Sequence, residues 1–446
     1  SLAIRQAVAA GVAITYKILY NDAVAMTGGQ SVDGQLGVAR ITRQLQAEGV
    51  EKIVVVTDET EKYAEITDLA SGTPVFHRDR LDEVQRTLRE FPGVSALIYD
   101  QTCATEKRRR RKRGTLADPE RRVFINEAVC EGCGDCSVQS NCLAIVPIET
   151  AFGRKRAIDQ SSCNKDFSCL KGFCPSFVTI EGGTLRSTEA VATNESEWPA
   201  LPDPALPGTR RPFNILITGV GGTGVVTLGA LLGMAAHLDG KGVSVLDMTG
   251  LAQKYGAVFS HVRIGDTPED IHATRIATGE ADAVIGGDLI VSASGEALSK
   301  MVEGHTRAVI DIAEIPTADF TRNPDWQLPT RRLSEKIGES CADTLFLDAR
   351  QLATSLLGDA LYANIFLLGV AWQRGLLPLS LASIKEAIEL NGTAVAQNLG
   401  AFLWGRRAGH DLKSVERLAV PAASAPAESL DELISSRPRA TSARCA

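Results

Sequence analysis

Three short apolar runs rich in β-branched residues lie near the start of the chain, at residues 14–20, 52–57 and 94–100. Two stretches of helical character separate them, at about 37–48 and 79–91. Strands that alternate with helices are typical of a parallel α/β layer. The pattern therefore predicts such a layer over the first part of the chain.

A second α/β alternation begins at residue 213. An apolar helix is expected at 224–238, and the apolar spacing over 361–404 predicts packed helices. Short apolar runs predict the strands of this region at residues 213–219, 242–248, 257–265, 281–287, 307–312 and 344–349. The whole pattern predicts a multidomain α/β protein.

Two stretches lack a buried pattern. Residues 188–212 hold five prolines in a polar context, which predicts an extended linker. From about residue 410 the chain is rich in Ala, Ser and Pro and ends without apolar periodicity. We therefore expect a disordered tail over residues 409–446.

Composition narrows the class of protein. The 446 residues allow about two to four domains, and the net charge of −7 does not favour a nucleic-acid binder. No apolar run reaches the ~18 residues that a membrane span needs, so we expect a cytoplasmic chain without a membrane segment. The chain starts without Met and leads directly into a predicted strand, which predicts that it begins within a domain.

Seven of the ten cysteines fall between Cys130 and Cys174. A secreted disulfide scaffold would be short and rich in cysteine throughout, whereas this group is local within a long chain. Metal or iron–sulfur ligation is therefore the better interpretation. Cys103, Cys341 and Cys445 have no partner spacing and are expected to be ordinary thiols.

The spacing of these cysteines is typical of iron–sulfur proteins. A C-x2-C-x2-C run, as at residues 130–136, lets three thiolates of one loop hold one iron–sulfur cube. In two-cluster ferredoxins the fourth cysteine of each run ligates the other cluster. The predicted ligand sets are Cys130, Cys133, Cys136 and Cys174 for one [4Fe–4S] cluster, and Cys142, Cys163, Cys169 and Asp166 for the other.

Asp166 stands where the second run needs its middle thiol, in the order C-x2-D-x2-C-x4-C-P. A carboxylate holds iron less tightly than a thiolate, so one iron of the second cluster is expected to be labile. The alternative is that Asp166 faces solvent while water binds that iron. Structural zinc is a further alternative, but zinc sites usually show paired knuckles and often histidine, and residues 123–185 contain no His.

The loop at residues 20–30 follows the first predicted strand and contains Asn21, Gly28 and Gly29. A Gly-Gly turn at the carboxyl end of a strand lets backbone N–H groups approach a phosphate closely. Side-chain and carbonyl oxygens suit Mg²⁺, which usually keeps substrate phosphates among its ligands. Taken alone, these are also ordinary turn residues.

Together, the AMTGGQ loop after Asn21, the eight-ligand segment and the later Gly-rich α/β unit resemble the 2-oxoacid:ferredoxin oxidoreductases, most closely the large fused indolepyruvate ferredoxin oxidoreductases. The resemblance implies that Asn21 ligates Mg²⁺ through its side chain and Ala23 through its carbonyl. Thr27, Gly28 and Gly29 would then lie along the diphosphate of thiamine diphosphate. The family's upstream Gly-Asp-Gly and its pyrimidine-binding domain are absent from this sequence, so we expect an incomplete thiamine site.

The resemblance also implies an order of domains. The C-terminal part of a thiamine diphosphate-binding α/β domain is expected at residues 1–122, and a ferredoxin-like domain with two [4Fe–4S] clusters at 123–185. A linker at 186–212 and a Rossmann-like, gamma-type α/β domain at 213–408 would follow. The implied reaction of the full, homodimeric enzyme oxidatively decarboxylates an arylpyruvate to an acyl-coenzyme A and passes the electrons to ferredoxin. We expect no turnover by this chain alone.

Residues 107–113 form a run of seven consecutive basic residues. A solvated linker is the simplest interpretation, because like charges in one loop are easily tolerated in water. The second is a patch that steers acidic ferredoxins toward the clusters. Nucleic-acid binding and a localisation signal are further alternatives.

The GVGGTG turn at residues 219–224 follows a predicted strand and opens a helix, and Asp247 ends the next strand. Read alone, it satisfies the dinucleotide fingerprint and favours a flavin- or nicotinamide-dependent electron-transfer subunit. The resemblance implies instead a gamma-type domain without a nucleotide, which helps to shape a path for coenzyme A. Lys254, His261 and Arg263 are candidate contacts for substrate or coenzyme A, although for His261 we expect a packing role with satisfied polar groups.

Overall fold

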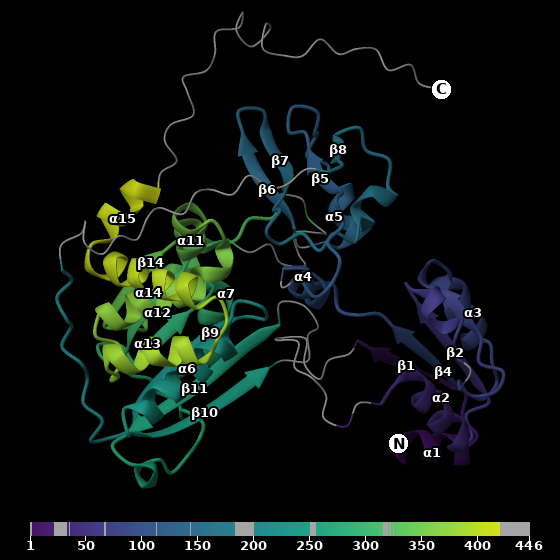
Figure 1. Ribbon diagram of the computed structural model, residues 1–446, viewed down its shortest axis with the longest axis horizontal. Coiled ribbons are helices and arrows are strands. Elements are labelled where there is room, and N and C mark those ends of the chain that lie inside the picture. Colours follow the sequence, from purple (N-terminus) through teal and green to yellow (C-terminus); the bar gives the residue numbers. More distant parts are fainter. Residues whose placement is uncertain are drawn as a thin grey trace, which may run out of the picture. The chain divides into compact units, whose positions relative to one another are not determined.

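The computed structural model divides into two compact units, whose elements are labelled in Figure 1. The first unit comprises Ser1–Thr184 and Ala318–Asp325, and the second comprises Leu185–Thr317 and Trp326–Ala446. The structure describes residues 2–21, 36–66, 68–112, 114–142, 144–182, 200–249, 256–314 and 325–419, together with residues 34, 320 and 323. Among these residues, no helix is both long and apolar enough to cross a membrane.

The first unit contains a parallel four-stranded sheet in the order β1-β4-β2-β3. Because alternate residues of a strand face opposite sides of a sheet, Val55 of β2 packs in the core that contains α1 and α2, whereas Val54 packs with α3. The predicted parallel α/β layer is confirmed. Its elements are α1 (Leu2–Ala9), β1 (Ile14–Tyr20), α2 (Val38–Ala47), β2 (Lys52–Thr57), β3 (Val75–His77), α3 (Leu81–Arg89) and β4 (Val94–Asp100).

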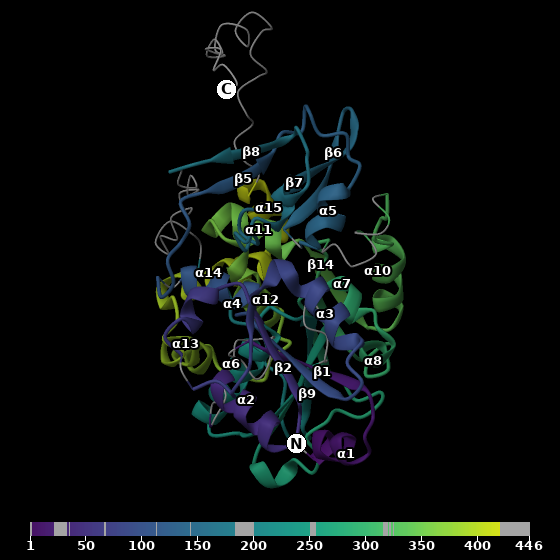
Figure 2. The same cartoon turned by 90° about the vertical axis from the view of Figure 1, so that its right-hand side faces the viewer.

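Two small antiparallel sheets and a short helix form the cysteine-rich part of the first unit (Figure 2). β5 (Arg122–Ile125) pairs with β8 (Phe177–Ile180), and β6 (Ile145–Thr150) pairs with β7 (Gly153–Ile158). The short helix is α5 (Asp135–Ser140). The pairing of β5 with β8 joins the two ends of the segment, so cysteines far apart in sequence can meet.

The second unit is built on a six-stranded sheet in the order β10-β11-β9-β12-β13-β14. β9, β12, β13 and β14 run parallel, whereas β11 is antiparallel to both β9 and β10. All six strands predicted in this region are confirmed. They are β9 (Phe213–Val220), β10 (Gly242–Thr249), β11 (Ala257–Gly265), β12 (Ala283–Gly286), β13 (Arg307–Asp311) and β14 (Asp343–Leu347).

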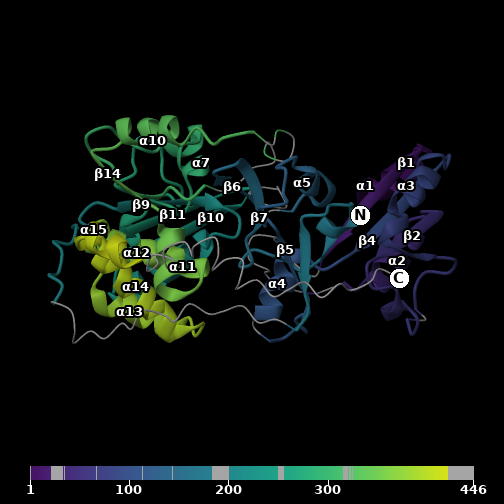
Figure 3. The same cartoon turned by 90° about the horizontal axis from the view of Figure 1, so that it is seen from above.

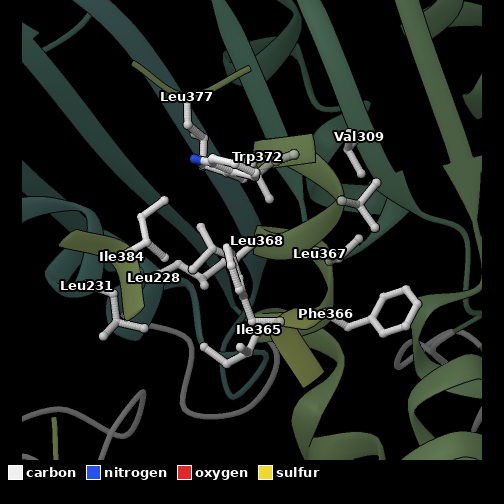
Figure 4. Close-up of a cluster of buried hydrophobic side chains, with 14 of the residues drawn as sticks. Leu228, Leu231, Val309, Ile365, Phe366, Leu367, Leu368, Trp372, Leu377 and Ile384 are labelled. Carbon is white, nitrogen blue, oxygen red and sulfur yellow. The ribbon is translucent and has the colours of Figure 1, made fainter. Parts of the chain in front are cut away.

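Helices cover both faces of this sheet, and Figure 3 shows α7 and α10 on one side and α12, α13 and α14 on the other. Trp372 of α12 lies within the larger core, beside Leu377 (Figure 4). Its indole Nε1 donates to the carbonyl of Leu379 at 2.9 Å. The predicted apolar helix and packed helices are confirmed. The helices are α6 (Val225–Leu238), α7 (Leu289–Ser292), α8 (Gly295–Leu298), α10 (Thr330–Glu339), α11 (Ala349–Leu357), α12 (Ala363–Gln373), α13 (Leu381–Leu390) and α14 (Val395–His410).

Two stretches expected to be irregular contain helices. The basic run lies largely within α4 (Ala104–Lys112) and is not an unstructured linker. The expected tail begins with α15 (Leu412–Ala419), because Val415 and Ala419 supply an apolar face that packs into the larger core. The remainder of that tail lies outside the described residues.

The described part of the proline-rich stretch, residues 200–212, contains no helix or strand, as expected for a linker. It is nevertheless anchored within the second unit. The carbonyl of Pro202 accepts a hydrogen bond from Gln373 Nε2 at 2.6 Å, and Thr209 is buried. The segment is therefore a packed connection.

Candidate metal centre

One group of cysteines surrounds a cavity of about 620 Å³ in the first unit. The loop before α5 supplies Cys130 and Cys133, the first turn of α5 supplies Cys136, and Cys174 precedes β8. All four line the cavity, which Cys169 also reaches. The structure thus brings together the four side chains of the first predicted ligand set.

Two glycines allow the loop before α5 to turn. Gly132 has a φ of +76°, and a Cβ at this position would lie 2.3 Å from the carbonyl oxygen of Arg154. Gly134 is the N-cap of α5 and has a φ of +84°. The Gly132 N–H also donates a hydrogen bond to Sγ of Cys130 at 3.4 Å. Donors aimed at a sulfur stabilise its anionic form, which a metal-binding thiol requires.

Cys142, Cys163 and Cys169 form a second group, with Asp166 beside them. The pKa of Cys169 is raised to about 12, first by burial and then by the charges of Cys142, Cys163 and Asp166. Burial also raises the pKa of Cys163. Because like charges gathered in a partly buried place disfavour ionisation, the group suits a positively charged occupant.

The carboxylate of Asp166 closes a turn in this second group. It accepts hydrogen bonds from the N–H of Ser168 at 3.2 Å and from Ser168 Oγ at 2.9 Å. The flanking residues Lys165 and Phe167 have φ values of +52° and +57°, which non-glycine residues adopt only where the surrounding structure fixes them. Asp166 is exposed, and a carboxylate has lone pairs beyond those that Ser168 uses. This geometry suits either an iron ligand or a solvent-facing turn residue.

The chemistry of these donors can be tested against the predicted clusters. The described residues contain no group of three or more His, Cys, Asp or Glu side chains that could hold a single metal ion. A [4Fe–4S] cluster requires no such group, because each thiolate binds a different iron of the cube and the four sulfurs need not converge on one point. The two groups are rich in thiols and lack histidine, so the residues fit iron–sulfur clusters in type and in grouping.

The basic helix α4 contacts the loop that carries the second group. Arg108 Nη1 donates to the carbonyl of Ser162 at 3.0 Å, and Arg111 Nη1 donates to the carbonyl of Asn164 at 2.5 Å. These two carbonyls flank Cys163 in the sequence. The interpretation of the basic run as a solvated linker is therefore wrong for these two side chains, because chain folding brings α4 against the cysteine loop.

Arg156 of β7 was not singled out from the sequence. It is only 1% exposed and lines the cavity of the first cysteine group. The sequence signal was weak, since the residue lies in a short strand, Gly153–Ile158, that also carries other basic residues. Only the pairing of β6 with β7 and the turn of the cysteine loop direct this side chain inward.

The predicted magnesium and diphosphate loop lies mostly outside the described residues. Asn21 directly follows β1, at the carboxyl edge of the parallel sheet, where open α/β sheets bind their ligands. Tyr20 lies in register with Asp100, a buried carboxylate that pairs with Lys62 Nζ at 2.5 Å. The predicted site residues outside the described part are Ala23, Thr27, Gly28 and Gly29.

The Gly-rich turn of the second unit joins β9 to α6, as a dinucleotide fingerprint would. However, Gly224 faces Asn364 of α12, and a Cβ at Gly224 would lie 2.1 Å from the Asn364 side-chain nitrogen. Asp247 lies on β10, which β11 separates from β9. Asp247 is therefore about two strand spacings, ~10 Å, from β9. In the dinucleotide fingerprint, the acidic residue lies on the strand next to the one that precedes the Gly-rich turn. This topology does not favour a bound nucleotide.

His261 and Arg263 lie on β11, whereas Lys254 lies outside the described residues. His261 is fully buried, and its Nδ1 accepts a hydrogen bond from the N–H of Ile276 at 3.3 Å. Burial lowers its pKa to about 4. Its Nε2 has no hydrogen-bond partner among the described residues, so the expectation of fully satisfied polar groups is wrong on that side of the ring. Arg263 Nη1 donates to the carbonyl of Arg275 at 3.3 Å.

The fold and the sites define a mixed α/β protein with a thiol-rich segment. Residues 214–408 match the family described as pyruvate ferredoxin/flavodoxin oxidoreductase. The chain is 30% identical over 208 residues to indolepyruvate oxidoreductase subunit IorB of Pyrococcus horikoshii, a match that covers 45% of this chain and 98% of IorB. IorB of Thermococcus kodakarensis gives the same identity and coverage.

The chain is also similar to solved structures. The gamma subunit of a keto/oxoacid ferredoxin oxidoreductase from Geobacter sulfurreducens is 22% identical, with a TM-score of 0.33, and the match covers 44% of this chain and 98% of that subunit. The near-complete coverage of IorB at 30% identity shows the relationship. The chain belongs to the pyruvate ferredoxin/flavodoxin oxidoreductase family, which confirms the resemblance noted from the sequence and supports an oxidoreductase role.

Proposed function

We propose that this chain is part of a thiamine-dependent indolepyruvate (arylpyruvate):ferredoxin oxidoreductase. The reaction is the oxidative decarboxylation of a 2-oxoacid to an acyl-coenzyme A, with the electrons passed to ferredoxin. The observation that carries the proposal is the match to IorB of Pyrococcus horikoshii over 98% of that subunit. The grouping of the cysteines in the first unit supports it independently, since electron transfer to ferredoxin calls for such clusters.

The two cysteine groups would hold two [4Fe–4S] clusters. The first would be bound by Cys130, Cys133, Cys136 and Cys174, which line one cavity. The second would be bound by Cys142, Cys163 and Cys169, with Asp166 as the candidate fourth ligand. In this assignment the chain's role is to hold both clusters in the first unit, so that single electrons leave toward ferredoxin.

The sheet of the first unit would contribute to a thiamine diphosphate site at the carboxyl edge of its strands. Asn21 would hold Mg²⁺ there, together with the carbonyl of Ala23, while Thr27, Gly28 and Gly29 would hold the diphosphate. Thiamine diphosphate, when bound, supplies the carbanion chemistry that decarboxylation of a 2-oxoacid requires. The second unit would be the gamma-type domain, near the path of coenzyme A.

The test begins with anaerobic reconstitution of the whole chain, followed by measurement of iron and sulfide and by electron paramagnetic resonance before and after reduction. Two four-iron clusters amount to about eight irons per chain. About seven irons, with a three-iron signal in the oxidised sample that converts when Fe²⁺ is added, would mean that the position of Asp166 holds iron weakly. Zinc without sulfide would overturn the proposal.

Two cysteine variants sharpen this test. Cys174→Ala should lose one cluster, since it removes a thiol from the first cavity. Cys341→Ala is the matched control, because Cys341 is buried in the second unit and contacts Met301 rather than the cysteine groups. We expect that the reconstituted chain by itself reduces no ferredoxin with indolepyruvate. Yellow colour from a retained flavin would support the nucleotide alternative instead.

A further inference from the structure

Arg156 presents a buried positive charge to the first cysteine group. Its side chain is 1% exposed and lines the same 620 Å³ cavity as Cys130, Cys133, Cys136 and Cys174. Arginine is rarely buried to this extent without a charged or polar partner. The neighbouring thiols, which bind metal as thiolates, can act as charged partners of this kind.

The charge of Arg156 is fixed. Burial lowers the pKa of the guanidinium, but the charges of Cys136, Cys130 and Cys133 raise it, and arginine stays protonated in proteins. These thiols are close enough for their charges to act on the guanidinium directly. In a buried setting such an attraction is screened far less than it would be in water.

The position of the guanidinium is fixed as well. Its central carbon lies 4.6 Å from the centre of the Phe320 ring, which is itself 3% exposed and belongs to the same unit. Its Nη1 donates to the carbonyl of Lys155 at 3.2 Å. A cation stacked on an aromatic face and hydrogen-bonded to the backbone is held in place rather than free to turn away.

We propose that Arg156 tunes the first cluster by raising the reduction potential of the centre held by Cys130, Cys133, Cys136 and Cys174. The inference rests on the proposed function, because it requires that the cavity hold a cluster. Reduction adds one electron from a one-electron donor and breaks no bond, and the same electron leaves to ferredoxin. Net charge near a cluster is one of the determinants of its potential, so a fixed cation favours the reduced form.

The second group has a different electrostatic setting. The carboxylate of Asp166 stands in place of a fourth thiolate, so the two predicted ligand sets carry the same number of negative charges. The cations of the second group are other residues: Arg108 and Arg111 donate to the carbonyls that flank Cys163. Burial raises the pKa of the Cys163 thiol, whereas the charges of Lys165 and Arg122 lower it. A change of charge at residue 156 is therefore expected to act on the first cluster and not on the second.

The experiment is a redox titration of the reconstituted full chain, followed by electron paramagnetic resonance, with Arg156→Gln, Arg156→Lys and Lys155→Gln. Arg156→Gln should lower the potential of one cluster and leave the other unchanged. We expect at least a tenfold fall in its ratio of reduced to oxidised form at a fixed potential, which is 59 mV for a one-electron couple. Arg156→Lys should keep the potential of that cluster close to its value in the unchanged protein, because lysine retains the positive charge.

Lys155→Gln is the matched control, since it removes the same charge from the neighbouring position of β7, whose side chain points to the other face of the strand. In Lys155→Gln, the ratio of reduced to oxidised form of each cluster at a fixed potential should change by less than threefold. Equal shifts in Arg156→Gln and Lys155→Gln, or no shift in Arg156→Gln, would overturn the inference. If Arg156→Gln fails to hold iron, Phe320→Leu takes its place, because loss of the stacking contact should lower the same potential.

These outcomes separate the inference from the proposed function. Absence of iron and sulfide from the unchanged chain would overturn the proposed function itself. Two loaded clusters whose potentials do not respond to the charge at residue 156 would leave the proposed function standing and reject only the role of Arg156.

Discussion

Arg111 of α4 donates a hydrogen bond from Nη1 to the carbonyl oxygen of Asn164 at 2.5 Å, and Arg108 donates in the same way to the carbonyl of Ser162 at 3.0 Å. The two contacts hold the backbone on either side of Cys163. Hydrogen bonds from a charged donor contribute about 1.5–3 kcal/mol each. The basic helix therefore stabilises the loop that carries the second cysteine group.

The double substitution Arg108→Gln/Arg111→Gln should loosen that loop and lower the iron content of the second site while sparing the first. Iron and sulfide analysis with electron paramagnetic resonance would measure the loss. Arg110→Gln is the control, because Arg110 pairs with Glu106 of its own helix at 3.2 Å. If the control and the double variant lose iron equally, the charge of the helix matters rather than the two contacts.

Gly132→Ala should disrupt the first cysteine loop. The new Cβ would lie 2.3 Å from the Arg154 carbonyl, a backbone atom that cannot move away cheaply, and the φ of +76° adds strain. We expect a loss of several kcal/mol in stability and failure to retain the first cluster. Thermal unfolding followed by circular dichroism, together with iron analysis, would check both effects.

Gly153→Ala is the matched control for this substitution. Gly153 has a similar positive φ of +89°, but no atom lies within 4 Å of the added Cβ. Its cost should therefore be limited to backbone strain, on the order of 1 kcal/mol. An equal loss in both variants would show that strain alone, and not the contact with Arg154, limits the loop.

The contact between α12 and α14 depends on glycine. A Cβ at Gly369 would lie 2.1 Å from the carbonyl oxygen of Phe402, and one at Gly405 would lie 2.0 Å from that of Phe366. Gly369→Ala should force the helices apart and destabilise the second unit by several kcal/mol. Gly338→Ala in α10 meets no atom within 4 Å and should stabilise the protein by about 0.5–1 kcal/mol. Urea unfolding of the two variants would reveal opposite changes in midpoint.

Asp311 should make the stability of the second unit depend on pH. Burial raises its pKa to about 7, although its carboxylate accepts hydrogen bonds from the N–H groups of Ala313 and Ala349. Because the folded pKa lies above the unfolded value of about 3.9, the folded form binds the proton more tightly. This contribution is fully present below about pH 4 and is lost as the pH rises through about 7.

Asp311→Asn should remove that dependence, since the amide oxygen can still accept both hydrogen bonds and the side chain carries no charge. Urea unfolding at pH 5 and at pH 8 would measure the difference. The unchanged protein should lose on the order of a few kcal/mol between these two pH values, and the variant should lose less. The same loss in both proteins would contradict the role of Asp311.

Local sequence pattern is sufficient to predict most of the secondary structure of both α/β layers. Runs such as residues 52–57 and 213–219 are apolar and β-branched, and their local preference agrees with the buried strand that the fold requires. The spacing of Cys130, Cys133 and Cys136 also determined that these thiols meet, since a loop this short leaves them few other arrangements. Local pattern and spacing are sufficient where the interacting residues are near in sequence.

Contacts between residues distant in sequence depend on how the chain folds. The pairing of β5 with β8 brings Cys174 to the first cysteine loop, and β7 directs Arg156 into the same cavity. Asp247 has the sequence distance from the Gly-rich turn that a dinucleotide fingerprint requires, but the antiparallel strand β11 lies between its strand and β9. Burial and charge proximity arise when the chain folds back on itself, and no local pattern in a single sequence specifies them.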